Sequence, residues 1–359
     1  MSYHNSYLSI IIVNFNGLDY LDRCIKSIID SNYKEVEIIV VDNGSSDESV
    51  KYIKNKYKNI FLSKLFIIEL DKNYGPAKAR NIGVERAKGE YLCFLDNDTI
   101  VHPNWAIPAI EEFKKNKRTG IIQCKLMLAS DRNKFDYIGE YLGTNGFLVQ
   151  RVPANIIDKG DYDYREIILA AKSAGMFIRK SVFDKISGFD TDYFIYVEET
   201  DLGWRSWLCG YEAVFIPDSI VYHEFGTSSI VLGESKNNYN AKFHGSKNYI
   251  LTNLKNLSFL NLLKILPIHI FLWFGLAFFS LIKGQFKAFF WIQCGIFWNI
   301  FNIRKTIKKR QKIQNSRKID DKILMQKIMI KKPFFYYFNK AIDQSRIGNA
   351  NGFVRKKND

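Results

Sequence analysis

The chain has 359 residues, of which 47% are hydrophobic, so it can bury a large core and carry an additional segment. Most of its net charge of +15 lies at one end: from Arg304 onward, 17 basic residues face four acidic ones, a net of +13. A near-neutral body with a basic end argues against a nucleic-acid-binding domain, and we expect no nucleic-acid partner. The pattern indicates a folded body held at an anionic surface.

The cysteines and the N-terminus bear on the compartment. Five cysteines lie far apart in the chain: Cys24, Cys93, Cys124, Cys209 and Cys294. An odd number without CxxC spacing argues against a disulfide framework and a zinc site, and fits a reducing cytosol. The first residues lead into an apolar strand without a basic region or a cleavage site, so we expect no signal peptide.

Short apolar strands alternate with helices over the first hundred residues. The expected strands are residues 9–13, 36–41, 65–70 and 91–95. Their β-branched, continuous apolar character is typical of buried parallel strands. Residues 18–29 carry helical spacing, and a helix running through Arg86 follows Gly75 and Pro76. The alternation predicts a doubly wound α/β sheet that is mostly parallel.

Polar residues stand where each of these strands ends. They are Asn14, Asp42, Asn73 and Asp96. Ligands of such sheets bind beyond the carboxyl ends of the strands, so this edge is the expected binding site. Asp96 and Asp98 are two residues apart and point the same way in an extended chain. Two carboxylates that converge in this way suit a divalent cation and, with it, a diphosphate.

The second half of the chain is expected to complete this edge. The expected elements are a helix at 104–115, a strand at 120–123, strands and loops over 125–165, and a strand pair over 167–178 interrupted at 173–175. A helix then begins at Glu198 and ends at Gly210. Two further apolar stretches, 214–217 and 219–222, bring His223 back toward the sheet.

The composition shifts to Phe, Leu, Ile and Trp near Leu257. Residues 265–282 contain no Asp, Glu, Lys or Arg, and a second apolar run covers 288–303 after a loop with two lysines. Eighteen such residues just suffice to cross a bilayer, and the basic flanks suit a hairpin with both ends cytoplasmic. Helices that lie in the plane of the inner leaflet explain the same sequence. Burial of these helices in the globular core is the third alternative.

Six motifs, in this order, resemble family 2 inverting glycosyltransferases of the GT-A fold. They are Ser-Ile-Ile-Ile-Val-Asn-Phe-Asn (9–16), Val-Asp-Asn-Gly-Ser-Ser-Asp (41–47), Asn-Tyr-Gly-Pro-Ala-Lys-Ala-Arg-Asn-Ile-Gly (73–83), Asp-Asn-Asp (96–98), Glu-Glu-Thr-Asp-Leu-Gly-Trp-Arg (198–205) and His223. The resemblance covers roughly residues 6–260. It looks closest to the rhamnosyltransferase-like members that build cell-surface polysaccharides.

The resemblance implies a role for each motif residue. Those expected to bind the nucleotide-sugar donor are Val13, Asn14, Phe15, Asp42, Gly75, Lys78, Arg80 and Asp96. Asp98 would ligate Mg²⁺ or Mn²⁺, Asp96 would contact both ribose and metal, and His223 would complete the metal site.

The pair Glu198–Glu199 matches the Glu-Asp of the family, whose second acid usually serves as the base. Glu199 is therefore the expected base, with Glu198 and Asp201 as further catalytic candidates. The longer side chain at 199 leaves an exchange of roles between 198 and 199 open. Asp201 and Arg205 are also spaced for a simple surface ion pair.

The resemblance implies an enzyme that moves one sugar from a nucleotide-diphosphate sugar to a hydroxyl of a lipid-linked or growing glycan. A missing Gln-x-x-Arg-Trp motif points to one sugar per binding event. The expected parts are a GT-A domain at 1–256, membrane-associated helices at 257–303 and a basic tail at 304–359. The expected location is the cytoplasmic face of the cell membrane, peripheral or hairpin-anchored. The alternatives are a polyisoprenyl-phosphate glycosyltransferase and a non-catalytic nucleotide-sugar-binding scaffold.

Overall fold

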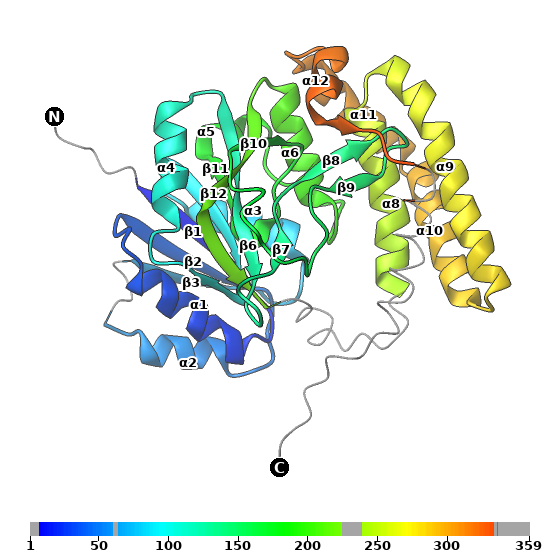
Figure 1. The fold of residues 1–359 in the computed structure, drawn as a ribbon. Coiled ribbons are helices and arrows are strands. Elements are labelled where there is room, and N and C mark those ends of the chain that lie inside the picture. Colours follow the sequence, from blue (N-terminus) through cyan, green and yellow to red (C-terminus); the bar gives the residue numbers. More distant parts are fainter. Residues whose placement is uncertain (1–6, 60–63, 225–238, 334–335, 337–359) are drawn as a thin grey trace.

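The computed structural model describes residues 7–59, 64–224, 239–333 and 336. A ten-stranded sheet with helices around it forms the body, and a layer of helices from the last third of the chain lies along one side (Figure 1).

The first half of the sheet is parallel. Its strands are β1 (Leu8–Asn14), β2 (Val36–Asp42), β3 (Leu65–Glu69) and β4 (Tyr91–Asp96). They lie in the order β3-β2-β1-β4, and each pair of neighbours is parallel. The four predicted strands and the α/β fold class are therefore confirmed.

Helices cover both faces of this half, which explains the continuous apolar strands. The connecting helices are α1 (Leu18–Asp30), α2 (Ser49–Lys56) and α3 (Pro76–Arg86). In β1, Ile10 and Ile12 join one apolar cluster, which contains residues of α1 and α2. Ile11 joins the other cluster, which contains residues of α3. Alternate residues of one strand thus fill two cores.

The second half of the sheet is mixed. Its strands are β5 (Thr99–Val101), β6 (Thr119–Leu128), β7 (Phe135–Tyr137), β10 (Glu166–Ile168), β11 (Met176–Arg179) and β12 (Glu212–His223). Strand β11 lies between β4 and β6 and is antiparallel to both. The stretches expected at 214–217 and 219–222 are one strand, β12, whose pairing with β6 shifts between Ile216 and Ile220. Pro217 lies at this shift, where its missing N–H costs no ladder bond.

The remaining elements of the body are short. They are α4 (Ala106–Lys115), β8 (Glu140–Gly143), β9 (Leu148–Gln150), the 3₁₀ helix η1 (Ser173–Gly175), α5 (Lys180–Lys185) and α6 (Glu198–Leu208). The segment 125–165, expected to form strands and loops, contains β7, β8 and β9. The interruption expected at 173–175 is η1, which leads directly into β11.

The register of the parallel strands brings their polar ends together. Asn14 at the end of β1 pairs with Asp42 at the end of β2. On the other side of β1, Val13 pairs with Asp96 at the end of β4. Polar side chains that are 28 to 82 positions apart in sequence therefore share one edge of the sheet.

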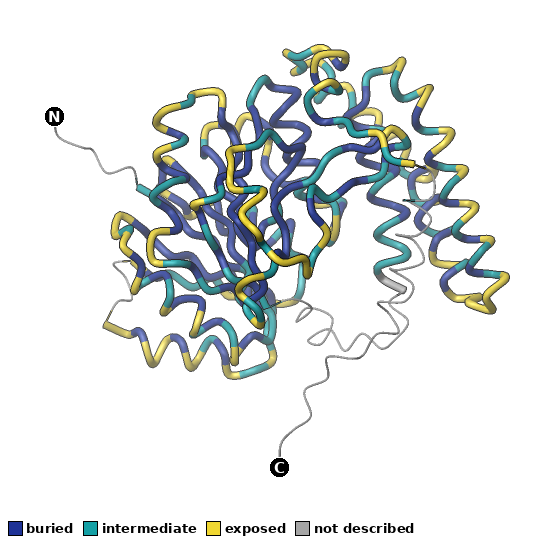
Figure 2. Tube along the Cα trace, viewed as in Figure 1, coloured by how far each residue is buried: buried dark blue, intermediate teal, exposed yellow. Residues whose placement is uncertain are grey.

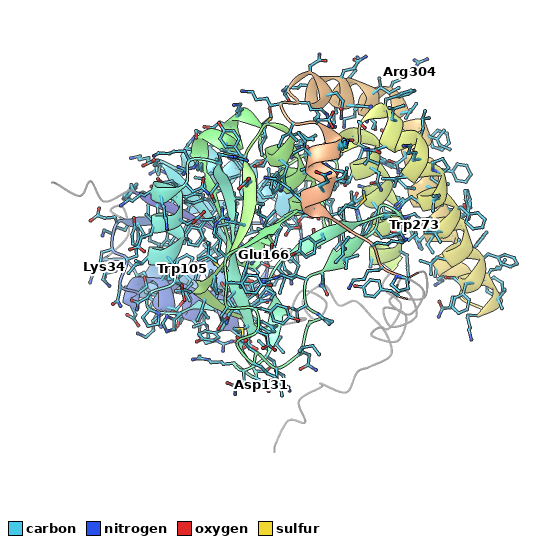
Figure 3. The ribbon with its side chains drawn as sticks, turned by 45° about the horizontal axis from the view of Figure 1, so that its top comes forward. Lys34, Trp105, Asp131, Glu166, Trp273 and Arg304 are labelled. Atoms are coloured by element: carbon cyan, nitrogen blue, oxygen red, sulfur yellow. The ribbon has the colours of Figure 1, made fainter. Side chains whose placement is uncertain are left out.

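The helical layer consists of α8 (Tyr239–Asn256), α9 (Phe259–Ile282), α10 (Phe286–Phe301), α11 (Ile303–Asn315) and α12 (Asp321–Ile328), followed by β13 (Met329–Ile330). The outer sides of α9 and α10 are largely exposed in Figure 2. In Figure 3, side chains near the labelled Trp273 and Arg304 project outward from this layer. By length and composition, α9 is the one helix among the described residues that could cross a membrane.

The basic stretch after residue 303 packs on both the helical layer and the body. Arg310 of α11 donates to the carbonyl oxygens of Leu254 and Leu257 at 2.7 and 2.6 Å. Strand β13 pairs with β8, so the chain is in contact with the body up to Ile330. Residues 337–359 of the predicted tail lie outside the described residues.

Substitutions in helix α12 test whether this stretch belongs to the folded body. Leu324 is fully buried in the main apolar cluster, whereas its neighbour Ile323 is 52% exposed. Leu324→Ala should lower stability by about 2–5 kcal/mol, because it removes buried methyl groups and leaves a cavity. Ile323→Ala should change it by about 0.5 kcal/mol or less. Chemical denaturation of the full chain measures both, and equal effects would mean that α12 is not part of the core.

Candidate functional site

Asn14 links the polar strand ends that are predicted to bind the donor. Its Nδ2 donates to Asp42 Oδ1 at 2.9 Å and to the Ser49 hydroxyl at 3.0 Å. Its Oδ1 accepts from Asn97 Nδ2 at 2.8 Å. Asp42 also accepts from the backbone N–H and hydroxyl of Ser45, at 3.0 and 2.5 Å. Both side chains are buried, so their bonds fix the loops that follow β1 and β2.

The other predicted donor residues surround this edge. Val13 and Phe15, on either side of Asn14, are half-buried. Gly75 has φ +79°, a conformation that favours glycine, and its N–H donates to Asn73 Oδ1 at 2.9 Å. The Lys78 ammonium lies 3.7 Å from the centre of the Tyr74 ring.

Arg80 joins the two halves of the site. This buried guanidinium lies 3.2 Å from Asp96 Oδ1, 3.0 Å from Glu198 Oε1 and 3.9 Å from Glu199 Oε1. Planar guanidinium groups suit several carboxylates at once. Because Asp96 ends β4 and the two glutamates begin α6, Arg80 brings the donor edge and the expected base together.

Glu198 and Glu199 have different surroundings. Glu198 is buried, and burial together with the negative charge of Glu199 raises the pKa of Glu198 to about 8, although Arg80 opposes this. Its Oε2 atom is buried and has no hydrogen-bond partner among the described residues. Glu199 is more accessible and accepts from the Ser173 hydroxyl at 2.6 Å and from its N–H at 3.3 Å. Glu199 is thus the better placed of the two to meet a substrate.

Asp96, Asp98 and His223 form a cluster that fits a divalent cation. Their ligand atoms all lie within 4.8 Å of one another, and His223 Nε2 is 3.4 Å from Asp98 Oδ1. Two carboxylates suit Mg²⁺ or Mn²⁺, and an imidazole can complete the set. The three predicted metal ligands come from β4, the loop after it and the end of β12.

A residue outside the predicted set orients the histidine. Asp136 of β7 lies 2.8 Å from His223 Nδ1, which leaves Nε2 facing the cluster. Burial disfavours the charged ring, but the bonds to Asp136 and Asp98 outweigh burial and raise the pKa of His223 to about 10. Binding of a cation at Nε2 would release this proton.

The structure separates one catalytic candidate from the others. Asp201 is fully buried and contacts Arg205, Lys255 and Asn256 at 2.8, 2.8 and 2.9 Å. These partners lie on α6 and α8, and they occupy the carboxylate. Asp201 therefore attaches α6 to α8, and its pair with Arg205 is a buried one and not the surface pair considered from the sequence.

Two residues of the site, Asp136 and Ser173, are not identifiable from the sequence, for different reasons. Nothing in the sequence marks Asp136, because only the pairing of β7 with β6 brings it near His223. Ser173 lies in the recognised interruption at 173–175, but its contact with Glu199 depends on the packing of η1 near α6.

Residues 9–186 match a family model described as glycosyl transferase family 2. An uncharacterized glycosyltransferase of Haemophilus influenzae is 40% identical over 94 residues, which are 26% of this chain and 37% of that protein. A poly-beta-1,6-N-acetyl-D-glucosamine synthase of Staphylococcus epidermidis is 26% identical over 218 residues, 60% of this chain and 49% of that one. The chain thus spans half or less of the length of these relatives.

A solved structure supports the same fold. The crystal structure of GalNAc-T7 with UDP, GalNAc and Mn²⁺ aligns with a TM-score of 0.53 and 20% identity, covering 68% of this chain and 51% of that one. Identity this low indicates a shared fold and nothing finer. Residues 9–186 are therefore a glycosyl transferase family 2 domain.

Proposed function

We propose that the chain transfers one sugar, with inversion, from a nucleotide-diphosphate sugar to a hydroxyl of a lipid-linked or growing glycan in cell-surface polysaccharide synthesis. The contacts of Arg80 are the observation that carries this proposal. They hold Glu199, an accessible carboxylate, beside the cluster of Asp96, Asp98 and His223, which fits a divalent cation. The polysaccharide context is supported by the name of the S. epidermidis relative. The rhamnosyltransferase-like branch stays a prediction, because that name concerns N-acetylglucosamine.

In this proposal Glu199 removes the proton of the acceptor hydroxyl. The Ser173 hydroxyl and N–H bind its Oε1 and orient the carboxylate. Glu198 is buried and holds Arg80 in place at 3.0 Å, so it is less able than Glu199 to reach an acceptor hydroxyl. A Mg²⁺ or Mn²⁺ ion held by Asp98, Asp96 and His223 would offset the negative charge of the leaving diphosphate.

The two alternatives are less well supported. A polyisoprenyl-phosphate acceptor is already ionised and needs little base, whereas Glu199 is oriented by two hydrogen bonds. A non-catalytic scaffold needs neither this carboxylate nor the cluster of Asp96, Asp98 and His223. Incubation with a panel of UDP-, GDP- and dTDP-sugars and Mn²⁺ or Mg²⁺ tests the proposal. Failure of every donor to be hydrolysed or transferred would contradict it.

The exposed apolar face of α9 and α10 is the proposed contact with the cytoplasmic membrane face. Its most exposed members are Phe259, Leu260, Phe271, Phe278, Ile282, Phe286 and Phe301. On its other side, α9 buries residues at helical spacing. Ile265 packs in the large apolar cluster that contains residues of α3, and Trp273 and Ala277 pack with residues of α8 and α10. A helix with one side covered by protein and the other apolar suits placement in the interface plane better than a hairpin across the bilayer.

Replacing the two glutamates separately distinguishes their roles. Glu199→Gln keeps size and polarity but cannot accept a proton, so transfer should fall by roughly 10²-fold or more while donor affinity stays within a few-fold. Glu198→Gln should reduce transfer less. Steady-state rates and donor titrations measure this. A larger loss from the change at 198 would reverse the assignment.

Removal of Asp98 should abolish the effect of the cation on donor binding. In Asp98→Ala the cluster keeps one carboxylate and one imidazole, so Mn²⁺ should no longer tighten binding of the donor nucleotide. Asp161→Ala, a change at an exposed acid elsewhere, is the matched control and should behave as the unaltered chain. Isothermal titration of UDP with and without Mn²⁺ gives the comparison, and full metal dependence in Asp98→Ala would exclude this site.

The membrane proposal is tested by adding charge to the apolar face. Phe271 and Phe278 are 74% and 61% exposed, so Phe271→Asp/Phe278→Asp should leave the melting temperature nearly unchanged. It should weaken binding to vesicles containing phosphatidylglycerol at least tenfold, because the face must then bury two carboxylates. Tyr52→Asp, at a 43% exposed aromatic residue of α2, is the control. Unchanged vesicle sedimentation of the double variant would contradict the proposal.

A further inference from the structure

The segment just before the two glutamates has an unusual backbone. Phe194, Tyr196 and Val197 have φ of +59°, +69° and +68°, in the region that favours glycine. Residues with side chains adopt this conformation at a cost in free energy, and three within four positions persist only where their surroundings hold them. Val197 is the residue directly before α6, and its carbonyl oxygen accepts from the N–H of Asp201 at 3.0 Å. The conformation of this segment therefore sets where α6 begins.

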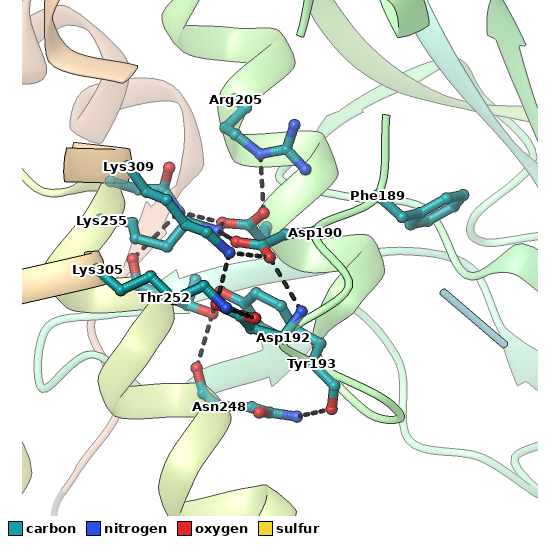
Figure 4. A network of polar contacts seen from close by, with 12 residues as sticks. Phe189, Asp190, Asp192, Tyr193, Arg205, Asn248, Thr252, Lys255, Lys305 and Lys309 are labelled. Atoms are coloured by element: carbon teal, nitrogen blue, oxygen red, sulfur yellow. Dashed lines mark hydrogen bonds and ion pairs between the residues drawn. The ribbon is translucent and has the colours of Figure 1, made fainter. Parts of the chain in front are cut away.

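One side chain holds most of this segment. Asn248 of α8 is fully buried, and its Nδ2 lies 3.1, 2.8 and 2.8 Å from the carbonyl oxygens of Tyr193, Ile195 and Tyr196. Two N–H groups thus serve three carbonyl groups. Figure 4 shows Asn248 beside Tyr193, at the lower end of a larger polar network.

The rest of this network fixes the chain just before the segment. The Tyr193 hydroxyl lies 2.8 Å from Thr252 Oγ1, and Lys255 Nζ lies 2.6 Å from Asp190. Lys305 and Lys309 of α11 bind Asp192 at 2.5 and 2.6 Å (Figure 4). These contacts hold residues 190–193, whereas Asn248 acts on the left-handed part itself.

The segment also touches the donor side. A Cβ atom added to Gly75 would lie 2.7 Å from both the ring and the carbonyl oxygen of Phe194. The segment therefore lies between the loop that opens α3 and the start of α6. A change in its conformation would move the glutamates relative to the donor edge.

We propose that Asn248 is a positioning residue for transfer: it fixes the left-handed segment and, through it, the carboxylate of Glu199. Asn248 is fully buried and acts through the segment. This inference rests on the proposed function, because it assigns Glu199 the role of base. A displacement of about 1 Å at a reacting group can cost on the order of 10²-fold in rate.

A graded series at position 248 tests the inference in the full chain. Asn248→Asp keeps the shape but presents oxygens to three carbonyl oxygens, and Asn248→Ser keeps one donor. We expect kcat for transfer to fall in the order Asn, Ser, Asp, by at least tenfold for Asp, while KM for the donor stays within about threefold. A role limited to stability would change the folded fraction without this split.

Asn299→Asp is the matched control. Asn299 of α10 is also buried and donates to two carbonyl oxygens, those of Lys247 and Gly295, both at 3.0 Å, but it does not touch the segment. Rates are compared per folded molecule, with the folded fraction taken from circular dichroism. We expect Asn299→Asp to lower the melting temperature and leave kcat within twofold.

The outcomes separate the inference from the proposed function. Two results would overturn the inference and leave the proposed function in place. One is an equal loss of kcat in Asn248→Asp and Asn299→Asp. The other is an unchanged kcat in both Asn248→Ser and Asn248→Asp. If Asn248→Asp does not fold, Asn248→Ser decides, and an unchanged kcat overturns the inference. If the unaltered chain transfers sugar from none of the donors, both the proposed function and this inference are overturned.

Discussion

The buried guanidinium of Arg80 is the charge on which the site depends. A buried cation is costly unless carboxylates surround it, and Arg80 has three within 3.9 Å. One of them ends β4 and two begin α6, so the requirement to neutralise Arg80 also fixes the distance between the donor edge and the expected base. Burial and the charge of Glu199 raise the pKa of Glu198 against the opposing effect of Arg80, and Glu199, bound by Ser173, is the more accessible carboxylate.

A second group of buried charges attaches the helical layer to the start of α6. Lys255 of α8 pairs with Asp190 and Asp201, both of which precede or lie in α6, and Lys309 of α11 also pairs with Asp190. Removing one partner from such a pair leaves an uncompensated buried charge, which is strongly destabilising. The start of α6 is therefore held from two sides, by Arg80 toward the sheet and by α8 and α11 toward the helices.

The sequence predicts those parts of this arrangement that depend on local pattern. Continuous apolar strands and the polar residues at their ends locate β1 to β4 and the edge with Asn14 and Asp96, because burial and strand direction decide both. Partners that only tertiary packing brings together, such as Asp136 and Ser173, have no sequence signal. From its composition, the lysine-rich segment of α11 is predicted to be part of a basic tail. In the structure, Lys305 and Lys309 form ion pairs with Asp192 and Asp190 of the body, which lie more than a hundred positions earlier in the chain.

Helix α8 connects the proposed membrane face to the proposed site. Asn248 on this helix binds the left-handed segment, while Ile250, two residues later, packs with Trp273 of α9 and Ile292 of α10 in a separate apolar cluster. Side chains of one helix that are two residues apart point in different directions, so α8 contacts the segment on one side and the outer helices on the other. If the apolar face of α9 and α10 rests on lipid, α8 holds the site at a fixed position relative to that surface. A lipid-linked acceptor, whose sugar extends only a short way from the membrane, requires a fixed position of this kind.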